Sequence, residues 1–125
     1  MKILVTGGAG FIGSHLVDLL LAQNHQVVVL DNFSTGKLQN LPSADRRLSV
    51  INGDICCSDT VEQAASSCDA IVHLAAVASV QASVDDPAGT HQVNLVGTLN
   101  LLEAAKKYNI RRFVFASSAA VYGNT

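Results

Sequence analysis

Short runs of branched apolar residues alternate along the chain with longer amphipathic stretches. Five such runs predict β-strands, over residues 3–5, 27–31, 48–51, 70–74 and 113–116. Runs of this kind are typical of parallel strands that are buried on both faces. The stretches between them predict helices over residues 14–23, 58–67 and about 88–108. Ser58 is the expected N-cap of the second helix. Leu95, Leu99 and Leu102 repeat at helical spacing, which predicts a buried face on the third.

Strands and helices alternate throughout, and this pattern predicts a doubly wound α/β fold. All strands would be parallel, with right-handed crossovers and the strand order 3-2-1-4-5. Apolar residues make up 49% of the chain and charged residues 14%, which indicates one globular domain over residues 1–125. In this order, the carboxyl ends of the first and fourth strands border the crevice in which a ligand binds. Segments 7–13, 75–78 and 117–118 are expected to meet there.

Three glycines, Gly7, Gly10 and Gly13, separate the first predicted strand from the first predicted helix. A strand, a glycine-rich turn and a helix are the signature of a dinucleotide site, in which phosphate binds the free N–H groups of the helix N-terminus. The G-x-x-G-x-x-G spacing is one residue longer than the common motif, and a glycine pattern alone also fits an ordinary flexible turn. Asp31, at the end of the second strand, favours the dinucleotide, because a carboxylate there accepts adenosine ribose hydroxyls and repels a 2′-phosphate. The sequence therefore predicts NAD, rather than NADP, as the cofactor.

Other residues near this crevice keep two interpretations each. Lys37, in the polar loop after the second strand, either meets a phosphate or is solvated. Asp54 either accepts the adenine amino group, with Ile55 packing on the ring, or is a helix-capping or turn carboxylate. The small residues 75–78 either admit a flat ligand or pack tightly. Asn94 lies among apolar neighbours, so its amide must find partners.

Composition and charge exclude several function classes. The net charge is −2 and the basic residues are scattered, so the chain has no electrostatic footprint for nucleic acid. No apolar run reaches the ~18 residues that span a bilayer and no signal peptide is visible, so no membrane partner is expected. Cys56, Cys57 and Cys68 show no metal spacing and no C-x-x-C, and the histidines are spread out. These features predict no metal site and a reducing, cytoplasmic location.

Six motifs occur in order along the chain: T-G-G-A-G-F-I-G, D-N-F-S-T-G, G-D-I, H-L-A-A, N-x-x-G-T-x-N-L-L-E-A-A and S-S-A-A-V-Y-G. Together they resemble the extended short-chain dehydrogenases/reductases, that is, the NAD-dependent nucleotide-sugar epimerases and dehydratases. The resemblance implies that Ser118 is the catalytic serine, which hydrogen-bonds the sugar hydroxyl being oxidised. It also implies a set of NAD-binding residues, namely Gly7, Gly10, Phe11, Ile12, Gly13, Asp31, Asn32, Phe33, Ser34, Thr35, Gly36, Asp54, Ile55, Leu74, Ala75, Ala76, Val77, Ala78 and Asn94.

The segment before V-Y-G (residues 121–123) discriminates within this family. Dehydratases and decarboxylases usually carry acidic residues there, whereas this chain has Ala119 and Ala120. The resemblance therefore favours a 4-epimerase of a UDP-hexose, which oxidises the C4 hydroxyl with bound NAD and returns the hydride to the other face of the sugar. Many such epimerases have lysine at the position of Ala78 and threonine or serine at that of Ala120. A dehydratase or reductase of the same family and a non-catalytic dinucleotide-binding module remain the alternatives.

The general base of the family is a tyrosine in a Tyr-x-x-x-Lys helix beyond the catalytic serine. Tyr108 and Tyr122 are the only tyrosines here, and neither is followed four residues later by lysine. The chain is therefore expected to be the N-terminal, NAD-binding part of a longer enzyme, inactive alone and without the C-terminal substrate domain. The resemblance also implies a homodimer of the full-length form, packed through the helix over residues 88–108. Strand 113–116 would be an unpaired apolar edge, which predicts self-association of the isolated chain.

Overall fold

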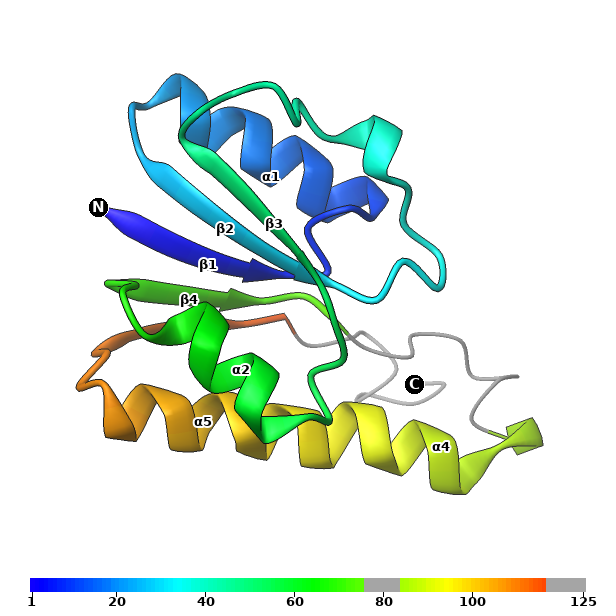
Figure 1. Ribbon diagram of the computed structural model, residues 1–125. Coiled ribbons are helices and arrows are strands. Elements are labelled where there is room, and N and C mark those ends of the chain that lie inside the picture. The colour runs from blue at the N-terminus through cyan, green and yellow to red at the C-terminus, as the bar shows by residue number, and fades with distance from the viewer. Residues whose placement is uncertain (76–83, 117–125) are drawn as a thin grey trace, which may run out of the picture.

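The computed structural model describes residues 1–75 and 84–116. Within them, five strands form one parallel sheet in the order β3-β2-β1-β4-β5 (Figure 1). The strands are β1 (Lys2–Thr6), β2 (Gln26–Asp31), β3 (Leu48–Asn52), β4 (Ala70–His73) and β5 (Arg112–Phe115). Each differs from its predicted range by at most one residue at either end. The predicted strand order and the doubly wound α/β fold are therefore confirmed.

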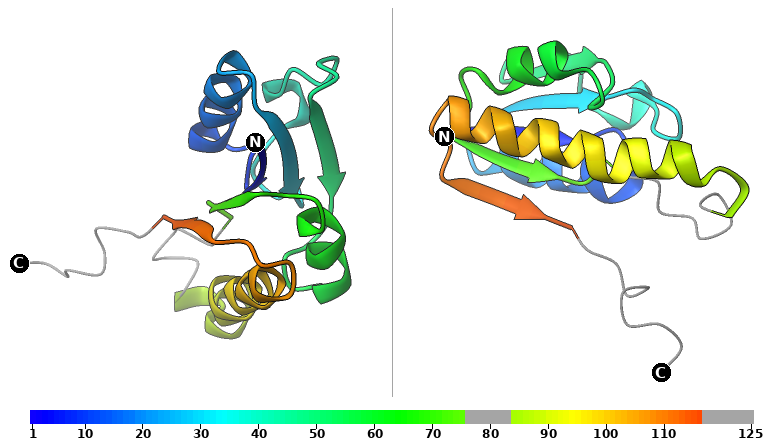
Figure 2. Two further views of the ribbon diagram at one scale, coloured as in Figure 1. Left: turned by 90° about the vertical axis from the view of Figure 1, so that its left-hand side faces the viewer. Right: turned by 90° about the horizontal axis from the view of Figure 1, so that it is seen from below.

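Helices cover both faces of the sheet (Figures 1 and 2). One face carries α1 (Phe11–Ala22), and a short 3-10 turn, η1 (Leu38–Asn40), interrupts the loop between β2 and β3. The other face carries α2 (Ser58–Ala65) and a long helical run. This run consists of α4 (Pro87–His91), the π-helical segment η2 (Gln92–Val96) and α5 (Gly97–Lys107). The sheet is thus the middle of three layers.

The central strand β1 is buried on both faces, as its run of branched residues predicts. Leu4 packs with Ile71 and Leu101 in the core on the α2 and α5 side. Its neighbour Val5 points to the opposite face and packs with Val17 of α1. Successive residues of a strand point to opposite faces, so one apolar run supplies both cores. Their burial fixes the carboxyl end of β1, where the glycine turn begins.

The ends of the first two helices differ from the predicted ones. The first helix begins at Phe11, earlier than the predicted residue 14, because Gly10 already acts as its N-cap with an extended backbone (φ −76°, ψ −178°). The second helix has Cys57, and not Ser58, as its N-cap. A turn at Asp54, whose carbonyl accepts the Cys57 N–H at 3.0 Å, brings the chain into helical geometry one residue early. The same helix ends at Ala65, two residues before the predicted end.

The prediction that Leu95, Leu99 and Leu102 form a buried face is wrong. These side chains are 49%, 49% and 46% exposed. The face that packs on α2 and the sheet instead holds Leu101 with small residues, among them Ala104 and Ala105, and Gly97 where the run approaches Ile55. Small residues let the helix lie close to its neighbours, so a face with a single large side chain becomes the buried one. The leucine repeat is an outward-facing apolar stripe.

The predicted edge strand is present. β5 pairs with β4 at one end of the sheet, with Val114 opposite Val72. Val114 and Phe115 are 58% and 55% exposed, whereas Phe113 packs against the core on the α5 side. The apolar edge is thus as expected, and self-association through it stays a prediction.

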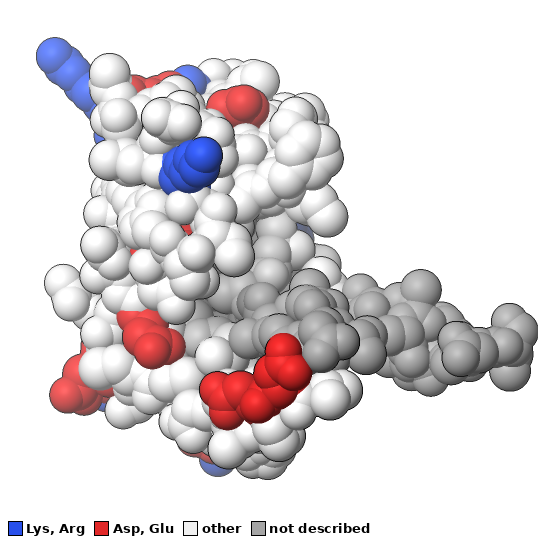
Figure 3. All heavy atoms as spheres, turned by 90° about the vertical axis from the view of Figure 1, so that its right-hand side faces the viewer, with Lys and Arg blue, Asp and Glu red and all other residues white. Residues whose placement is uncertain are grey.

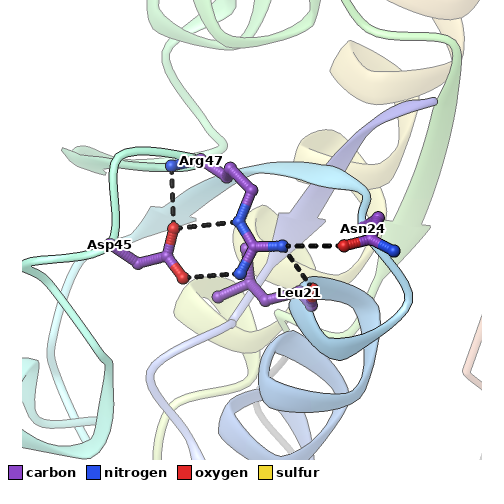
Figure 4. Close-up of polar contacts among 4 residues, drawn as sticks. All are labelled: Leu21, Asn24, Asp45 and Arg47. Atoms are coloured by element: carbon purple, nitrogen blue, oxygen red, sulfur yellow. Dashed lines mark hydrogen bonds and ion pairs between the residues drawn. The ribbon is translucent and has the colours of Figure 1, made fainter.

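Arg47, the residue before β3, makes several contacts at the amino end of the sheet (Figure 4). Its guanidinium pairs with Asp45 at 2.9 Å and donates to the Leu21 carbonyl at 2.7 Å and to the Asn24 side chain at 3.5 Å. Asn24 has a positive φ of 66°, which ends α1 in the left-handed conformation common after helices. This clamp ties the C-terminus of α1 to the strand beside β2. It stabilises the end of the sheet opposite the predicted ligand crevice.

Candidate dinucleotide-binding site

The glycine turn lies between β1 and α1, and its close approaches explain two of the three glycines. Gly7 has a φ of +69°, and a Cβ on it would lie 2.9 Å from the Ala75 nitrogen. A Cβ on Gly13 would collide with the Gly7 carbonyl oxygen. At Gly10 a Cβ would meet its nearest atom at an ordinary 3.4 Å. Gly7 and Gly13 are therefore required by the fold, and Gly10 is not.

The N-terminus of α1 is open to an anion. Its N-cap, Gly10, has no side chain, and the first turn holds no acidic residue. Phe11 and Ile12 are 79% and 71% exposed. The first N–H groups of a helix lack partners within it and carry the positive end of its dipole. An uncapped end without nearby acidic side chains is thus suited to bind phosphate.

Asp31 lies beside this turn at the carboxyl end of β2, and it is buried. One carboxylate oxygen accepts the Ala9 N–H at 2.9 Å, and the other accepts the Phe33 N–H at 2.8 Å. The side chain therefore organises both the glycine turn and the loop that follows β2. Each carboxylate oxygen has a second lone pair, so these bonds leave room to accept a hydroxyl group.

The loop after β2 folds back over the glycine turn. The Asn32 side chain accepts the Ser34 N–H at 3.0 Å, and Gly36 lies so close to Ala9 that a Cβ would come within 2.7 Å of its carbonyl carbon. The Lys37 N–H donates to the Ala9 carbonyl at 3.2 Å. Two hollows flank this loop. One, of about 350 Å³, is lined by Gly10, Phe11, Ser14, His15, Thr35, Lys37, Gln39 and Asn40. The other, of about 510 Å³, is lined by Phe33, Gly36, Lys37, Leu38, Val50 and Asn52.

The first of these hollows is lined both by predicted site residues and by residues that the sequence did not identify. His15 is one of the latter. Its Nδ1 lies 2.7 Å from the Phe11 carbonyl oxygen and its ring lies 4.7 Å from that of Phe11. Asn40 is another, and its side-chain amide donates to the Ala9 carbonyl at 3.0 Å. Neither belongs to a spacing that marks dinucleotide sites, so only the folded loop identifies them.

Asp54 and Ile55 lie where β3 leads into α2. The Asp54 carboxylate accepts the Cys56 N–H at 2.9 Å, which is the turn role weighed for it from the sequence. Ile55 is buried in the core, and its carbonyl accepts the Asn100 side-chain amide at 2.9 Å. The Cys57 thiol, at the exposed N-cap of α2, has its pKa lowered by hydrogen bonds from Thr60. Contact of Asp54 and Ile55 with adenine stays a prediction.

The fourth strand brings Leu74 and Ala75 next to the glycine turn. Their N–H groups donate to the hydroxyl oxygen of Thr6, at 3.0 and 3.1 Å. Asn94 is half-buried in η2, on the helical run that borders this end of β4. The remaining predicted residues, Ala76, Val77, Ala78 and Ser118, lie outside the described residues.

Charge is sparse on the face that holds the carboxyl ends of the strands. Figure 3 shows scattered basic and acidic side chains, with most of the acidic ones in the lower part of the view and no continuous basic patch among the atoms described there. In residues 1–75 and 84–116, no three His, Cys, Asp or Glu side chains gather as metal ligands would. None of the helices in the described part of the chain has the length and apolar character that crossing a membrane requires.

Comparison with known families adds to this geometry. The model of the NAD dependent epimerase/dehydratase family matches residues 3–125. The chain belongs to this family. The match covers the glycine turn, Asp31 and all the other predicted site residues, so the resemblance stated from the six motifs is confirmed.

Individual family members are similar over nearly the whole chain. UDP-glucose 4-epimerase of Mycolicibacterium smegmatis is 47% identical over 98% of the chain, and UDP-glucuronic acid decarboxylase 2 of Arabidopsis thaliana is 42% identical over 99%. The crystal structure of the UDP-glucose 4-epimerase of Thermus thermophilus in complex with NAD matches 94% of the chain with a TM-score of 0.87 and 47% identity. The chain spans 41%, 27% and 38% of these three proteins, respectively.

Proposed function

We propose that the chain is the NAD-binding part of a nucleotide-sugar 4-epimerase, which transfers a hydride transiently at C4 of a UDP-hexose. One observation carries the cofactor assignment. The uncapped N-terminus of α1 lies over a tightly packed glycine turn, and the buried Asp31 carboxylate joins that turn to the loop after β2. An anion-binding helix end next to a fixed carboxylate suits the pyrophosphate and the ribose of a dinucleotide.

The cofactor would be divided among the predicted residues as follows. The pyrophosphate would bind the first N–H groups of α1, at Phe11 and Ile12. Asp31 and the loop of residues 32–36 would hold the adenosine ribose, and Asp54 with Ile55 would border the adenine. Residues 74–78 and Asn94 would line the nicotinamide half. When bound, NAD supplies the hydride acceptor and donor of the reaction. This chain binds and orients it and excludes a 2′-phosphate through the charge of Asp31.

The proposed reaction on a UDP-hexose is supported by the similar family members and by the sequence of residues 117–123. Ser118 would hydrogen-bond the sugar hydroxyl that is oxidised, and the tyrosine base would come from outside these residues. Ala119 and Ala120 supply no acid–base group for loss of water or CO2, which favours epimerisation. The 42% identity to a decarboxylase keeps a dehydratase or decarboxylase as the second candidate. A non-catalytic dinucleotide-binding module is the third.

We further propose that the whole protein is a homodimer. The outward-facing stripe of Leu95, Leu99 and Leu102 is an exposed apolar surface of a kind that usually packs against a partner. All three cysteines are free, which suits a reducing compartment, and we place the enzyme in the cytoplasm. A C-terminal substrate domain would complete the sugar site.

The test of the cofactor proposal is calorimetric titration of wild type, Asp31→Asn and Asp18→Asn with NAD+ and NADP+. Asp18 is exposed on α1, so its variant makes the same change of net charge away from the site. Wild type and Asp18→Asn should prefer NAD+. Asp31→Asn should bind NAD+ more weakly and lose part of the preference over NADP+. Equal behaviour of the two variants would refute the role of Asp31. Epimerase turnover of UDP-galactose by the whole protein that disappears in Ser118→Ala would support the sugar half.

A further inference from the structure

A chain of hydrogen bonds passes through His73, the last residue of β4. His73 is 2% exposed. Its Nδ1 lies 2.6 Å from the Thr6 hydroxyl oxygen, and its Nε2 lies 2.9 Å from the Thr98 hydroxyl oxygen. The Thr98 hydroxyl in turn donates to the Asn94 carbonyl at 2.8 Å. One imidazole ring therefore bridges the first strand of the sheet and the long helical run.

The partners fix the direction of every bond in this chain. The Thr6 oxygen accepts the N–H groups of Leu74 and Ala75, which occupy its two lone pairs. The Thr6 hydrogen must then be donated to Nδ1 of His73. Nε2 carries the ring hydrogen and donates it to Thr98, whose own hydrogen goes to the Asn94 carbonyl. His73 is thus neutral, with its hydrogen on Nε2. The Leu74 N–H is shared between the hydroxyl oxygen of Thr6, at 3.0 Å, and the carbonyl oxygen of Thr6, at 3.2 Å.

The surroundings of the ring preserve this state. The rings of Phe113 and Phe115 lie 6.5 and 5.7 Å from the His73 ring, centroid to centroid. Burial lowers the pKa of His73 to about 4. A proton added at Nδ1 would point at the hydroxyl oxygen of Thr6, whose lone pairs already accept the N–H groups of Leu74 and Ala75. The bridge therefore holds in one arrangement across the neutral pH range.

The groups joined by this bridge belong to the proposed cofactor site. On one side are the N–H groups of Leu74 and Ala75, just after β4. On the other is the carbonyl of Asn94 in η2, a π-helical segment of a kind that often marks a functional position within a helix. We propose that His73 is a positioning residue for the nicotinamide half of the site, which sets the separation between Asn94 and the Leu74–Ala75 backbone through Thr98 and Thr6. This inference rests on the proposed NAD-binding function.

Substitution of Thr98 interrupts the bridge with the least change of shape. Thr98→Val keeps the shape and removes the hydroxyl, whereas Thr98→Ser restores it. Thr90→Val, on α4 and outside the bridge, is the matched control. His73→Asn serves as a second variant, because its shorter side chain reaches the Thr6 hydroxyl but not Thr98. It should therefore resemble Thr98→Val.

The experiment titrates the full chain with NAD+ and with ADP-ribose, which lacks the nicotinamide ring. Thr98→Val and His73→Asn should weaken NAD+ binding by roughly threefold to tenfold, the effect of about one lost hydrogen bond, and leave ADP-ribose binding within about twofold. Thr98→Ser and Thr90→Val should bind both ligands as the wild type does. The enhancement of NADH fluorescence on binding reports on the surroundings of the nicotinamide ring. It should fall in Thr98→Val and His73→Asn and match the wild type in Thr98→Ser and Thr90→Val.

Two results would overturn the inference. One is equal weakening of NAD+ and ADP-ribose binding, because it would show a general structural role. The other is unchanged NAD+ binding and unchanged NADH fluorescence in folded Thr98→Val or His73→Asn. A wild-type chain that binds neither ligand would refute the proposed function itself, and this inference with it.

Discussion

Gly7 and Gly10 belong to one motif, yet the structure predicts opposite effects of replacing them by alanine. Gly7 has a φ of +69°, and a left-handed backbone costs an L-residue about 1–2 kcal/mol. Its new Cβ would also lie 2.9 and 3.0 Å from backbone atoms of Ala75, so the ends of β1 and β4 would have to separate. Together these effects should lower the free energy of unfolding of Gly7→Ala by about 2–4 kcal/mol.

At Gly10 the balance is different. Its φ of −76° suits any residue, and a Cβ would meet its nearest atom at 3.4 Å. Loss of a glycine N-cap is slightly unfavourable, whereas the stiffer unfolded chain is favourable by ~0.4–1 kcal/mol. Gly10→Ala should therefore stay within about 1 kcal/mol of the wild type. The methyl group would nonetheless lie where the proposed pyrophosphate approaches the helix N-terminus, so NAD+ binding should weaken by at least about tenfold.

Urea denaturation and calorimetric titration with NAD+ on the same preparations test both halves of this contrast. We expect Gly10→Ala to stay within about 1 kcal/mol of the wild type in stability but to bind NAD+ more weakly, and Gly7→Ala to be clearly less stable. Wild-type affinity for NAD+ in Gly10→Ala would refute the phosphate role of the turn. A loss of stability in Gly10→Ala as large as that in Gly7→Ala would refute the packing argument.

Burial and exposure give three further predictions. Burial lowers the pKa of His73 from 6.5 to about 4, so between these pH values the unfolded chain binds a proton that the folded chain does not. The free energy of unfolding should therefore fall by up to about 3 kcal/mol as the pH drops from 6.5 to 4. Urea denaturation across this range should show this loss in the wild type and not in His73→Gln. Leu101→Ala should lower the free energy of unfolding by ~2–5 kcal/mol, whereas Leu102→Ala, at the exposed neighbouring position, should lower it by less than ~1 kcal/mol. Equal losses in chemical denaturation would contradict the assignment of the buried face. In the whole protein, Leu99→Glu should weaken the proposed homodimer in sedimentation experiments and Leu19→Glu, similarly exposed on α1, should not. A matching effect of both would show that the leucine stripe is not the interface.

Much of the fold could be predicted because the strands of a buried parallel sheet are short apolar runs that can be recognised in the sequence. Each strand is a short branched run, and alternation with helices leaves few possible topologies. The motif also marked the turn that contains Gly7 and Gly13, whereas the close approaches that require these two glycines are seen only in the structure. The first turn of α1 was missed, because a turn with three glycines does not show which glycine ends it.

The buried face of α5 could not be read from its leucines. Periodicity shows that a helix has an apolar face, but not whether that face packs within the chain or faces outward. Here Gly97, Ala104 and Ala105 allow the close approach around the buried Leu101, and the other three leucines, Leu95, Leu99 and Leu102, face outward. His73 and Thr98 were also invisible as a pair, because only the crossover between β4 and the long helical run brings them together.

The most direct test of the NAD-binding claim is amide chemical-shift mapping of the 15N-labelled chain during titration with NAD+. We expect the largest shifts at residues 10–13 and 31–36, with further shifts at Leu74, Ala75 and Asn94. The amides around Arg47, at the opposite end of the sheet, should not move. Shifts centred on that end or on the outward leucine stripe, or no shifts at saturating NAD+, would contradict the NAD-binding claim.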